Sequence, residues 1–499
     1  MSGIRVTYSG LISLVFGLAS VFIGLIYMLI VIRTLEPIEY GTWTLIHGLI
    51  VYPLVIEPII TYWSTRETAR GIESSRTALF SGGVFSVFGI IIYLFVAYFI
   101  AQQSDANINV VLFGVILIPL IFLNRMLTAI NFGWKPHAPL IAQFIFVIFQ
   151  TVFALILVYF LELQVFGVII TVAIGYIASI ITLFVYAKKK IENKINWGFL
   201  KKWIKLFWLS LYPTIGYTIF LIDIVIFLVI TGSVLGLAFW GVALVISTTI
   251  HSAGLISRGV YAKLLQDDDH SFLSKNIMHL FYFLILLTAV MITFSKEVLF
   301  ILNPQYEIAF PVVIILSLHI FFNEIKGQSY TFLRGIEKVD TNQQATFKDY
   351  IKSKLFFIPT LELIQSIIYI GLLTIGLILL VNMKLSNIEL LIYWALILLL
   401  TQIPFSINGI SLLKKNLSIL IDIRTILKYI LIASVIFGII YFMTDKLLLY
   451  DESVYVFIPR LFLFVALGIG SYIGITYFVD QNTKELLHSI INEIKKKNN

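Results

Sequence analysis

The sequence predicts an all-α polytopic membrane protein, and two observations carry that prediction. The 499 residues are 60 % hydrophobic and only 12 % charged, with a mean hydropathy of +0.99. The apolar residues form long unbroken runs, and a helix needs about 20 such residues to cross a hydrocarbon core of about 30 Å. A membrane β-barrel would instead show segments of about 10 residues with alternating polarity. We therefore expect helical spans.

About fourteen such runs follow one another along the chain. The expected spans are residues 9–32, 40–63, 79–101, 108–130, 138–161, 166–187, 206–230, 234–257, 276–300, 308–333, 355–381, 387–412, 425–444 and 454–479. The first run begins close to Met1 but is longer than a signal-peptide core and lacks a small-x-small cleavage site. We therefore expect it to be retained as a span.

The positions of Lys and Arg predict that both termini are cytoplasmic, because cytoplasmic loops carry an excess of these residues. With the N-terminus inside, 27 cations fall on inner segments and four on outer ones, namely Arg33, Lys296, Lys384 and Lys446. The net charge of +8 therefore reflects the membrane topology and gives the protein some affinity for anionic lipid. Nucleic acid is not an expected partner. The expected location is the plasma membrane.

Several function classes are disfavoured. Cysteine is absent, which excludes disulfides, thiolate metal sites and cysteine catalysis. The run Asp267–His270 falls in a predicted cytoplasmic loop, where a solvated helix cap is expected. The longest outer connection, near Ser295–Glu307, is too short for the catalytic domain of a membrane glycosyltransferase, and no glycine-rich phosphate loop is present. We therefore expect a transporter and not an enzyme, without a cofactor or metal.

A basic amphipathic segment divides the chain. In KKKIENKINWGFLKKWIK (188–205) apolar residues recur at helical spacing between Lys residues, which is typical of a helix in the membrane interface. The second and eighth spans align Trp43 with Trp240 and Arg66 with Lys263 without gaps, so we expect two related bundles. The expected parts are an N-terminal lobe at 1–187, the linker at 188–205, a C-terminal lobe at 206–412, two further spans in 413–479 and a basic amphipathic tail at 480–499.

Charged side chains interrupt the apolar runs. A charge at the centre of a bilayer costs roughly 2.5–3.5 kcal/mol on insertion scales, so such residues are expected to face protein or water. They are Glu57, Arg125, Asp223, Arg258, Glu324, Lys326, Glu362 and Arg460.

Polar residues also recur at helical spacing in four spans of the second half, so each of these spans has a polar face. The four sets are His319, Asn323, Lys326 and Tyr330; Ser247, His251, Gly254 and Arg258; Glu362, Gln365, Ser366 and Tyr369; and Tyr212, Gly216 and Asp223. These faces predict a wet central cavity. The alternative is that they hydrogen-bond between helices, which stays open for the histidines and the neutral residues.

Several of these features resemble a known family. They are the six-plus-eight division of the spans, RTLEPIEYGTW (Arg33–Trp43), STRETARG (Ser64–Gly71), and a seventh span with a central acid followed by GSVLGLAFWGVALVIS. Together they resemble the polysaccharide/oligosaccharide flippases of the MOP exporter superfamily, which also contains the MATE exporters and the lipid II flippases. The resemblance implies a V-shaped pair of bundles that works by alternating access.

The resemblance also implies a cargo. Members of the polysaccharide branch move polyprenyl-phosphate or pyrophosphate-linked oligosaccharides from the inner to the outer leaflet for the assembly of cell-surface polysaccharide or glycan. It implies a monomer, with membrane lipids and enzymes of the same pathway, such as glycosyltransferases or a polymerase, as partners. By resemblance and position, the residues expected to bind phosphate or sugar are Arg66, Arg125, Arg258, Lys326, Arg460, His319, Asn323 and Tyr330.

Asp223 has two expected roles. It pairs with a cation such as Arg258 or Lys326, or it binds a coupling H⁺ or Na⁺. Glu57 is the rival coupling candidate, followed by Glu324 and Glu362. Glu324 and Lys326 are two residues apart and point in nearly opposite directions, so they are not expected to pair within their own helix.

Two other transporters remain as alternatives. A lipid II-type flippase shares the fold, the span number and the cationic cavity. A MATE-like cation-coupled multidrug antiporter needs only about twelve spans and favours an acidic, aromatic cavity, so the two additional spans and the cations disfavour it.

Overall fold

The computed structural model describes residues 6–192, 194–257, 264, 272–337, 339, 347–417, 419, 421–451, 453–481, 483–485 and 488. Regular structure within these residues is helical, and they contain no strand. The prediction of an all-α chain is confirmed.

Each expected span coincides with a helix or with helices joined at a break. The N-terminal elements are α1 (Val6–Thr34), α2 (Pro37–Leu54), α3 (Pro58–Ala69), α4 (Ser75–Ala101), α5 (Ile108–Phe113), η1 (Gly114–Ile116), α6 (Leu117–Trp134), α7 (Ala138–Ala154), η2 (Leu155–Phe160), α8 (Gln164–Ile191), α9 (Trp197–Lys205), α10 (Phe207–Phe220) and α11 (Asp223–Thr231). The later elements are α12 (Val234–Ser247), η3 (Thr248–Ser257), α14 (Phe272–Thr293), α15 (Ser295–Leu302), η4 (Pro304–Ala309), α16 (Phe310–Gly335), α17 (Phe347–Lys352), α18 (Lys354–Asn382), α19 (Asn387–Leu417), α20 (Ile423–Leu447) and α21 (Val454–Val479).

These helices have the length and composition of membrane spans. Among the described residues, 12 segments are long and apolar enough to cross a membrane, and the bent pair α2 and α3 makes a 13th. Helix α1 is 29 residues long, and its portion Phe22–Thr34 is apolar. With α1 included, every one of the expected spans has a helical counterpart.

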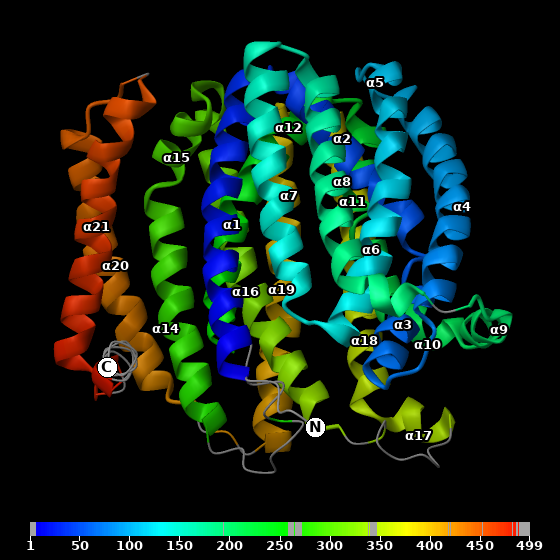
Figure 1. Ribbon diagram of the computed structural model, residues 1–499. Helices are drawn as coiled ribbons and strands as arrows, with labels where there is room; N and C mark the ends of the chain where they lie inside the picture. Colours follow the sequence, from blue (N-terminus) through cyan, green and yellow to red (C-terminus); the bar gives the residue numbers. More distant parts are fainter. Residues whose placement is uncertain are drawn as a thin grey trace. The chain divides into compact units, whose positions relative to one another are not determined.

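The chain forms two compact units. Unit 1 consists of Met1–Phe239 with Leu377–Asn387, and unit 2 consists of Trp240–Gly376 with Ile388–Asn499. Within each unit the long helices run roughly alongside one another, as neighbouring spans of one bilayer do (Figure 1).

The second span is bent where the sequence places its prolines. Helices α2 and α3 meet at 66°, with Pro53 inside α2 and Pro58 in the first turn of α3. Proline lacks a backbone donor and clashes with the preceding turn, so a helix breaks beside it. Glu57 stands at this break, directly before α3.

The seventh span is also broken, and Asp223 stands at the break. Helix α10 ends at Phe220 and α11 begins at Asp223. Its carboxylate accepts a 2.8 Å hydrogen bond from the backbone N–H of Ile224, and the N-terminus of a helix favours negative charge. The buried carboxylate of Asp223 is therefore stabilised locally, by the start of α11, although the residues around it are apolar.

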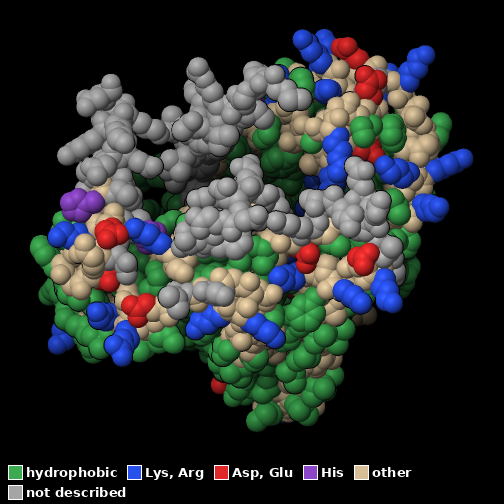
Figure 2. Space-filling view, turned by 90° about the horizontal axis from the view of Figure 1, so that it is seen from below, with side chains coloured by type: hydrophobic (Ala, Val, Ile, Leu, Met, Phe, Trp, Pro, Cys, Tyr) green, Lys and Arg blue, Asp and Glu red, His purple; other side chains and the backbone are tan. Residues whose placement is uncertain are grey.

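The linker forms a helix that packs on unit 1. In Figure 1, α9 lies across the ends of the long helices, and it contacts α3 and α4. Trp203 is fully buried, whereas Trp197 and Ile204 are exposed, so α9 packs on unit 1 through Trp203 and leaves these two apolar side chains uncovered. Figure 2 views this end of the molecule and shows numerous Lys and Arg side chains around its edge.

Candidate functional site

Unit 1 contains a cavity among α3, α6, α7, α8 and α10, with a volume of about 840 Å³ and a lining of both apolar and polar side chains. Its polar lining consists of Glu57, Thr61, Tyr62, Thr65, Arg66, Asn124, Arg125, Thr128, Gln143, Ser179, Ser210 and Thr214. Two of these residues are cationic and one is anionic, so the lining has a formal charge of +1. Hydroxyl and amide groups make up most of the rest.

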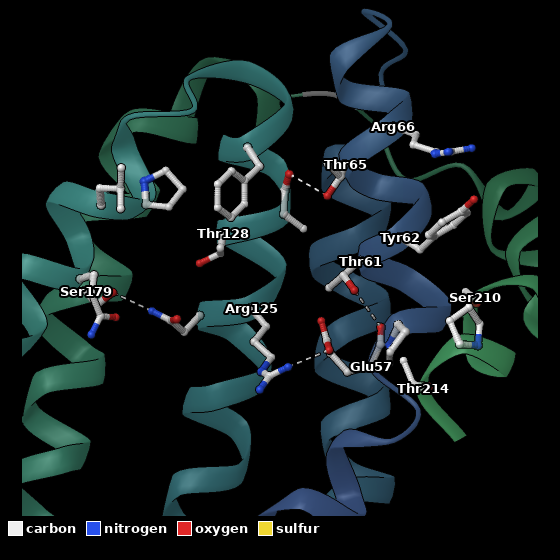
Figure 3. Close-up of a pocket in the computed structure, with 18 residues that line it drawn as sticks. Glu57, Thr61, Tyr62, Thr65, Arg66, Arg125, Thr128, Ser179, Ser210 and Thr214 are labelled. Carbon is white, nitrogen blue, oxygen red and sulfur yellow. Dashed lines mark hydrogen bonds and ion pairs between the residues drawn. The ribbon is translucent and has the colours of Figure 1, made fainter. Parts of the chain in front are cut away.

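An ion pair crosses this cavity between Arg125 on α6 and Glu57 at the break of the second span. The guanidinium donates to the Glu57 carboxylate over 3.1 Å, and Figure 3 shows the two side chains pointing toward one another. Glu57 is only 6 % exposed, whereas the Arg125 side chain is 51 % exposed. Arg125 therefore neutralises a buried acid and still presents much of its surface to the cavity.

Arg66, the second cation of the lining, lies on α3, beyond Glu57 along the chain. The guanidinium of Arg66 is 4.8 Å from the centre of the Tyr62 ring, an arrangement that favours a cation–π contact. Figure 3 shows Arg66 directed away from Arg125, so the two cations reach different parts of the lining. Asn124 donates to the Ser179 hydroxyl over 2.7 Å, which fixes one amide of the wall.

Asp223 lies near the same group of side chains. The Tyr217 hydroxyl is within electrostatic reach of both Asp223 and Arg125. Asp223 itself is buried and uses one carboxylate oxygen on the backbone of α11. Its expected partner Arg258 lies outside the described residues, as does the run Asp267–His270.

Unit 2 has its charged groups on two sides of α16. Glu324 accepts from His251 over 2.7 Å and from Gln328 over 2.8 Å. Lys326 instead donates to Gln365 of α18 over 2.7 Å and to Gln402 of α19 over 3.4 Å. The two neighbours on α16 therefore do not pair with each other, as the helical spacing predicts.

Lys326 is held by neutral amides. Gln365 also donates to Gln402 over 2.6 Å, and Gln402 donates to Ser406 over 3.1 Å. Among the described residues, no carboxylate forms an ion pair with Lys326. Glu362 lies within electrostatic reach of the ammonium group, but its carboxylate is paired with Arg334. Within the described residues Lys326 therefore has no acid of its own, which is the arrangement expected of an anion site.

Aromatic side chains link α12 to the two helices, α18 and α19, that carry the partners of Lys326. Trp240 of α12 and Trp394 of α19 stack with ring centres 3.8 Å apart. The Trp394 indole donates to the Tyr369 hydroxyl of α18 over 2.7 Å. This contact joins three of the helices that carry polar residues.

The other expected residues of unit 2 have different surroundings. Glu362 accepts from Arg334 with both oxygens, at 2.9 and 3.0 Å. His319 and Tyr330 are buried, and neither the His319 ring nitrogens nor the Tyr330 hydroxyl has a hydrogen-bond partner among the described residues. Asn323 is half-buried on the same helix.

Arg460 is not brought together with these groups. It stands near the start of α21, 4.0 Å from Asp451 and 3.4 Å from the Leu449 carbonyl oxygen, both in the preceding connection. Its neighbours are thus the end of a span and not the Lys326 cluster. No group of three or more His, Cys, Asp or Glu that could hold a metal occurs in the described part of the chain.

The sequence prediction missed three contributors to these sites. Arg334, Gln402 and Gln328 were not expected, although the structure places them on Glu362, Lys326 and Glu324. Arg334 follows Tyr330 by four residues and so continues the expected polar stripe of α16. Gln402 is an amide within an apolar span, a signal that is visible in the sequence.

Solved structures with this fold are known, although the sequence matches no protein-family model and no curated relative. One is an inward-facing multidrug resistance MATE family transporter of the MOP superfamily: the TM-score is 0.58 at 13 % identity, over 79 % of this chain and 95 % of that one. An outward-facing multidrug resistance MATE family transporter gives a TM-score of 0.50 at 14 % identity, over 81 % and 95 %. The chain therefore has the helical fold of the MATE transporters of the MOP superfamily.

Proposed function

We propose that this protein is an alternating-access membrane transporter that moves an anionic, lipid-linked oligosaccharide from the inner to the outer leaflet. The observation that carries the proposal is Lys326, a cation within a span whose hydrogen bonds, in the part of the chain that the structure describes, are to neutral amides. Placing an uncompensated charge there is costly. An anionic cargo would offset that cost when it binds.

The cavity of unit 1 supports the same cargo. Its formal charge is positive, and its hydroxyls, amides and the Tyr62 ring are groups that bind sugars by hydrogen bonds and by stacking. Arg125 and Arg66 can each donate several hydrogen bonds to a phosphate. A phosphate with an attached glycan matches this mixture better than an apolar cation does.

The fold supports the mode of action. Solved MATE structures exist in inward-facing and outward-facing conformations, and a transporter of this fold would expose its sites to each side in turn. The breaks at Glu57 and Asp223 are places where spans of this chain could bend. We infer a transporter and not an enzyme, located in the plasma membrane with both termini in the cytoplasm.

The proposal can be tested by flipping in proteoliposomes. A fluorescent polyprenyl-pyrophosphate oligosaccharide would be followed with wild type, Lys326→Ala and, as a matched control, Lys201→Ala on the exposed face of α9. We expect Lys326→Ala to lose most of the flipping and Lys201→Ala to retain it. Equal rates in all three proteins would contradict the proposal.

A multidrug antiporter is the second candidate, because the solved structures with this fold include multidrug MATE transporters. Such a protein would use Glu57 or Glu324 for a cationic drug. Efflux of an organic cation by a well-folded wild type that flips no lipid-linked sugar would favour this candidate. A lipid II-type flippase would be recognised in the same assay by a preference for that lipid.

A further inference from the structure

A histidine and a glutamate from different helical elements share one hydrogen bond in unit 2. His251 Nδ1 of η3 and Glu324 Oε2 of α16 are 2.7 Å apart, and the other carboxylate oxygen of Glu324 accepts from Gln328. The Glu324 side chain is only 12 % exposed, whereas that of His251 is 42 % exposed. The pair therefore has one buried member and one member that protons can reach.

The backbone of η3 is shaped for this contact. Thr248–Ser257 is a 3-10 segment that continues α12, and such stretches are often functional hinges. Gly254 stands against Glu324 so closely that a methyl group in its place would overlap the carboxylate and the Gln328 amide. Glycine at this position lets the carboxylate reach η3.

We propose that His251 and Glu324 form a proton-binding site whose occupancy changes the net charge across α16 from Lys326, so that a proton and an anionic cargo bind together. The nature of the cargo rests on the proposed function. The proton site itself rests on the contact between His251 and Glu324 at the 3-10 segment.

The charges of the two states follow from the chemistry of the pair. With one proton, a neutral imidazole donates from Nδ1 to the carboxylate, and the pair has a charge of −1. A second proton on Nε2 gives an imidazolium facing a carboxylate, with no net charge. The net charge of His251, Glu324 and Lys326 together therefore changes from 0 to +1 when the pair binds that proton. An anion then binds more tightly.

Other titratable groups surround the pair. On α16, His319 lies within electrostatic reach of both His251 and Lys326, and it is a second candidate for the proton. On α14, His279 is near Lys275, Asp480 and Glu485, a separate group. On α18, Glu362 is held by Arg334. The test must therefore separate the His251 and Glu324 pair from His319.

Binding and proton uptake can be measured on the same purified protein. The probe is a short-chain prenyl phosphoryl mannose, a phosphodiester whose single charge does not titrate between about pH 6 and pH 8, where histidine does. A unit charge acting over about 10 Å changes a binding constant by roughly ten-fold. We expect wild type to bind the probe roughly ten-fold tighter at about pH 6 than at about pH 8. When the probe binds in a weakly buffered solution, we also expect the protein to take up protons.

Three variants make the test specific. Glu324→Gln removes the negative charge of the pair, so it should bind the probe more tightly than the wild type at about pH 8, which also shows that it is folded. His251→Gln removes the imidazole that takes the second proton, so its affinity for the probe should be the same at both pH values and it should take up no proton when the probe binds. Glu362→Gln, the same change at another carboxylate of this unit, should retain the pH response. A pH response and proton uptake that are retained in His251→Gln would assign the proton to His319 and overturn the inference.

An infrared measurement tests the proton site without any cargo. The difference spectrum of the wild type between the two pH values should contain imidazolium bands that are absent from His251→Gln. Identical spectra in the two proteins would refute the proton site. Failure of the probe to bind to wild type, with the imidazolium bands present, would instead refute only the proposed cargo.

Discussion

The ammonium group of Lys326 donates to Gln365 over 2.7 Å, and this contact places a cation against a neutral amide in the interior of unit 2. Lys326 is half-buried and forms no ion pair with a described carboxylate. A charge that has lost part of its hydration without gaining a counter-charge is unfavourable for folding. Retaining such a residue suggests that its value lies in binding and not in stability.

The first prediction is that Lys326 contributes to anion binding and not to stability. Lys326→Met keeps a long unbranched side chain and leaves the Gln365 to Gln402 hydrogen bond in place. We expect thermal stability in detergent to be unchanged or to rise by up to about 1 kcal/mol, while binding of an anionic lipid phosphate falls at least ten-fold. Lys275→Met, which removes a half-exposed partner of Glu485, should alter neither quantity measurably.

The second prediction concerns the ion pair of the unit 1 cavity. Arg125→Ala leaves Glu57 buried without its cation, and we expect a loss of about 1–3 kcal/mol in thermal stability. Glu57→Gln alone should cost less, because the half-exposed Arg125 retains water. The double variant Glu57→Gln with Arg125→Ala should recover most of the loss, and purely additive effects would show that the two side chains do not interact.

The third prediction uses two glycines of unit 2. Gly254→Ala places a methyl group where the Glu324 carboxylate lies, so this flexible side chain must turn aside and lose its hydrogen bonds to His251 and Gln328. We expect a destabilisation of about 1 kcal/mol. At Gly327 on α16 the same methyl group meets no atom within 4 Å, so Gly327→Ala should be neutral or stabilise by up to about 1 kcal/mol. The unfolding temperatures of the two purified variants would be compared. Equal shifts would contradict the close approach of Gly254 to the Glu324 carboxylate.

The spans could be predicted from the sequence because bilayer thickness fixes their length and lipid fixes their composition. Opposite directions for Glu324 and Lys326 also follow from helical spacing alone. The bend at Glu57 could be expected from Pro58, because proline has only a local effect on its helix. These features depend on neighbours along the chain and not on packing.

Partners across helices could not be predicted in the same way. The position of Glu362 along its helix does not predict that Arg334 donates to its carboxylate. The rotation of α18 relative to α16 decides this contact, and packing of the whole unit sets that rotation. The change from α12 to a 3-10 segment at Thr248 was likewise not visible, since hydropathy is the same for both helix types. The hydrogen bond from the backbone of α11 to one oxygen of Asp223 was also not predicted, because hydropathy does not show that a helix begins there.

The last prediction concerns the attachment of the linker helix α9. Lys202 donates to Glu67 over 3.1 Å, and Glu67 is buried with its second carboxylate oxygen lacking a hydrogen bond among the described residues. Lys202→Ala therefore leaves a buried carboxylate without its cation, and we expect a loss of about 1–3 kcal/mol. Lys201→Ala removes an exposed neighbour and should change thermal stability by less than about 0.5 kcal/mol. If both variants unfold at the wild-type temperature, the ion pair does not hold α9 on α3, and the buried Trp203 alone is sufficient.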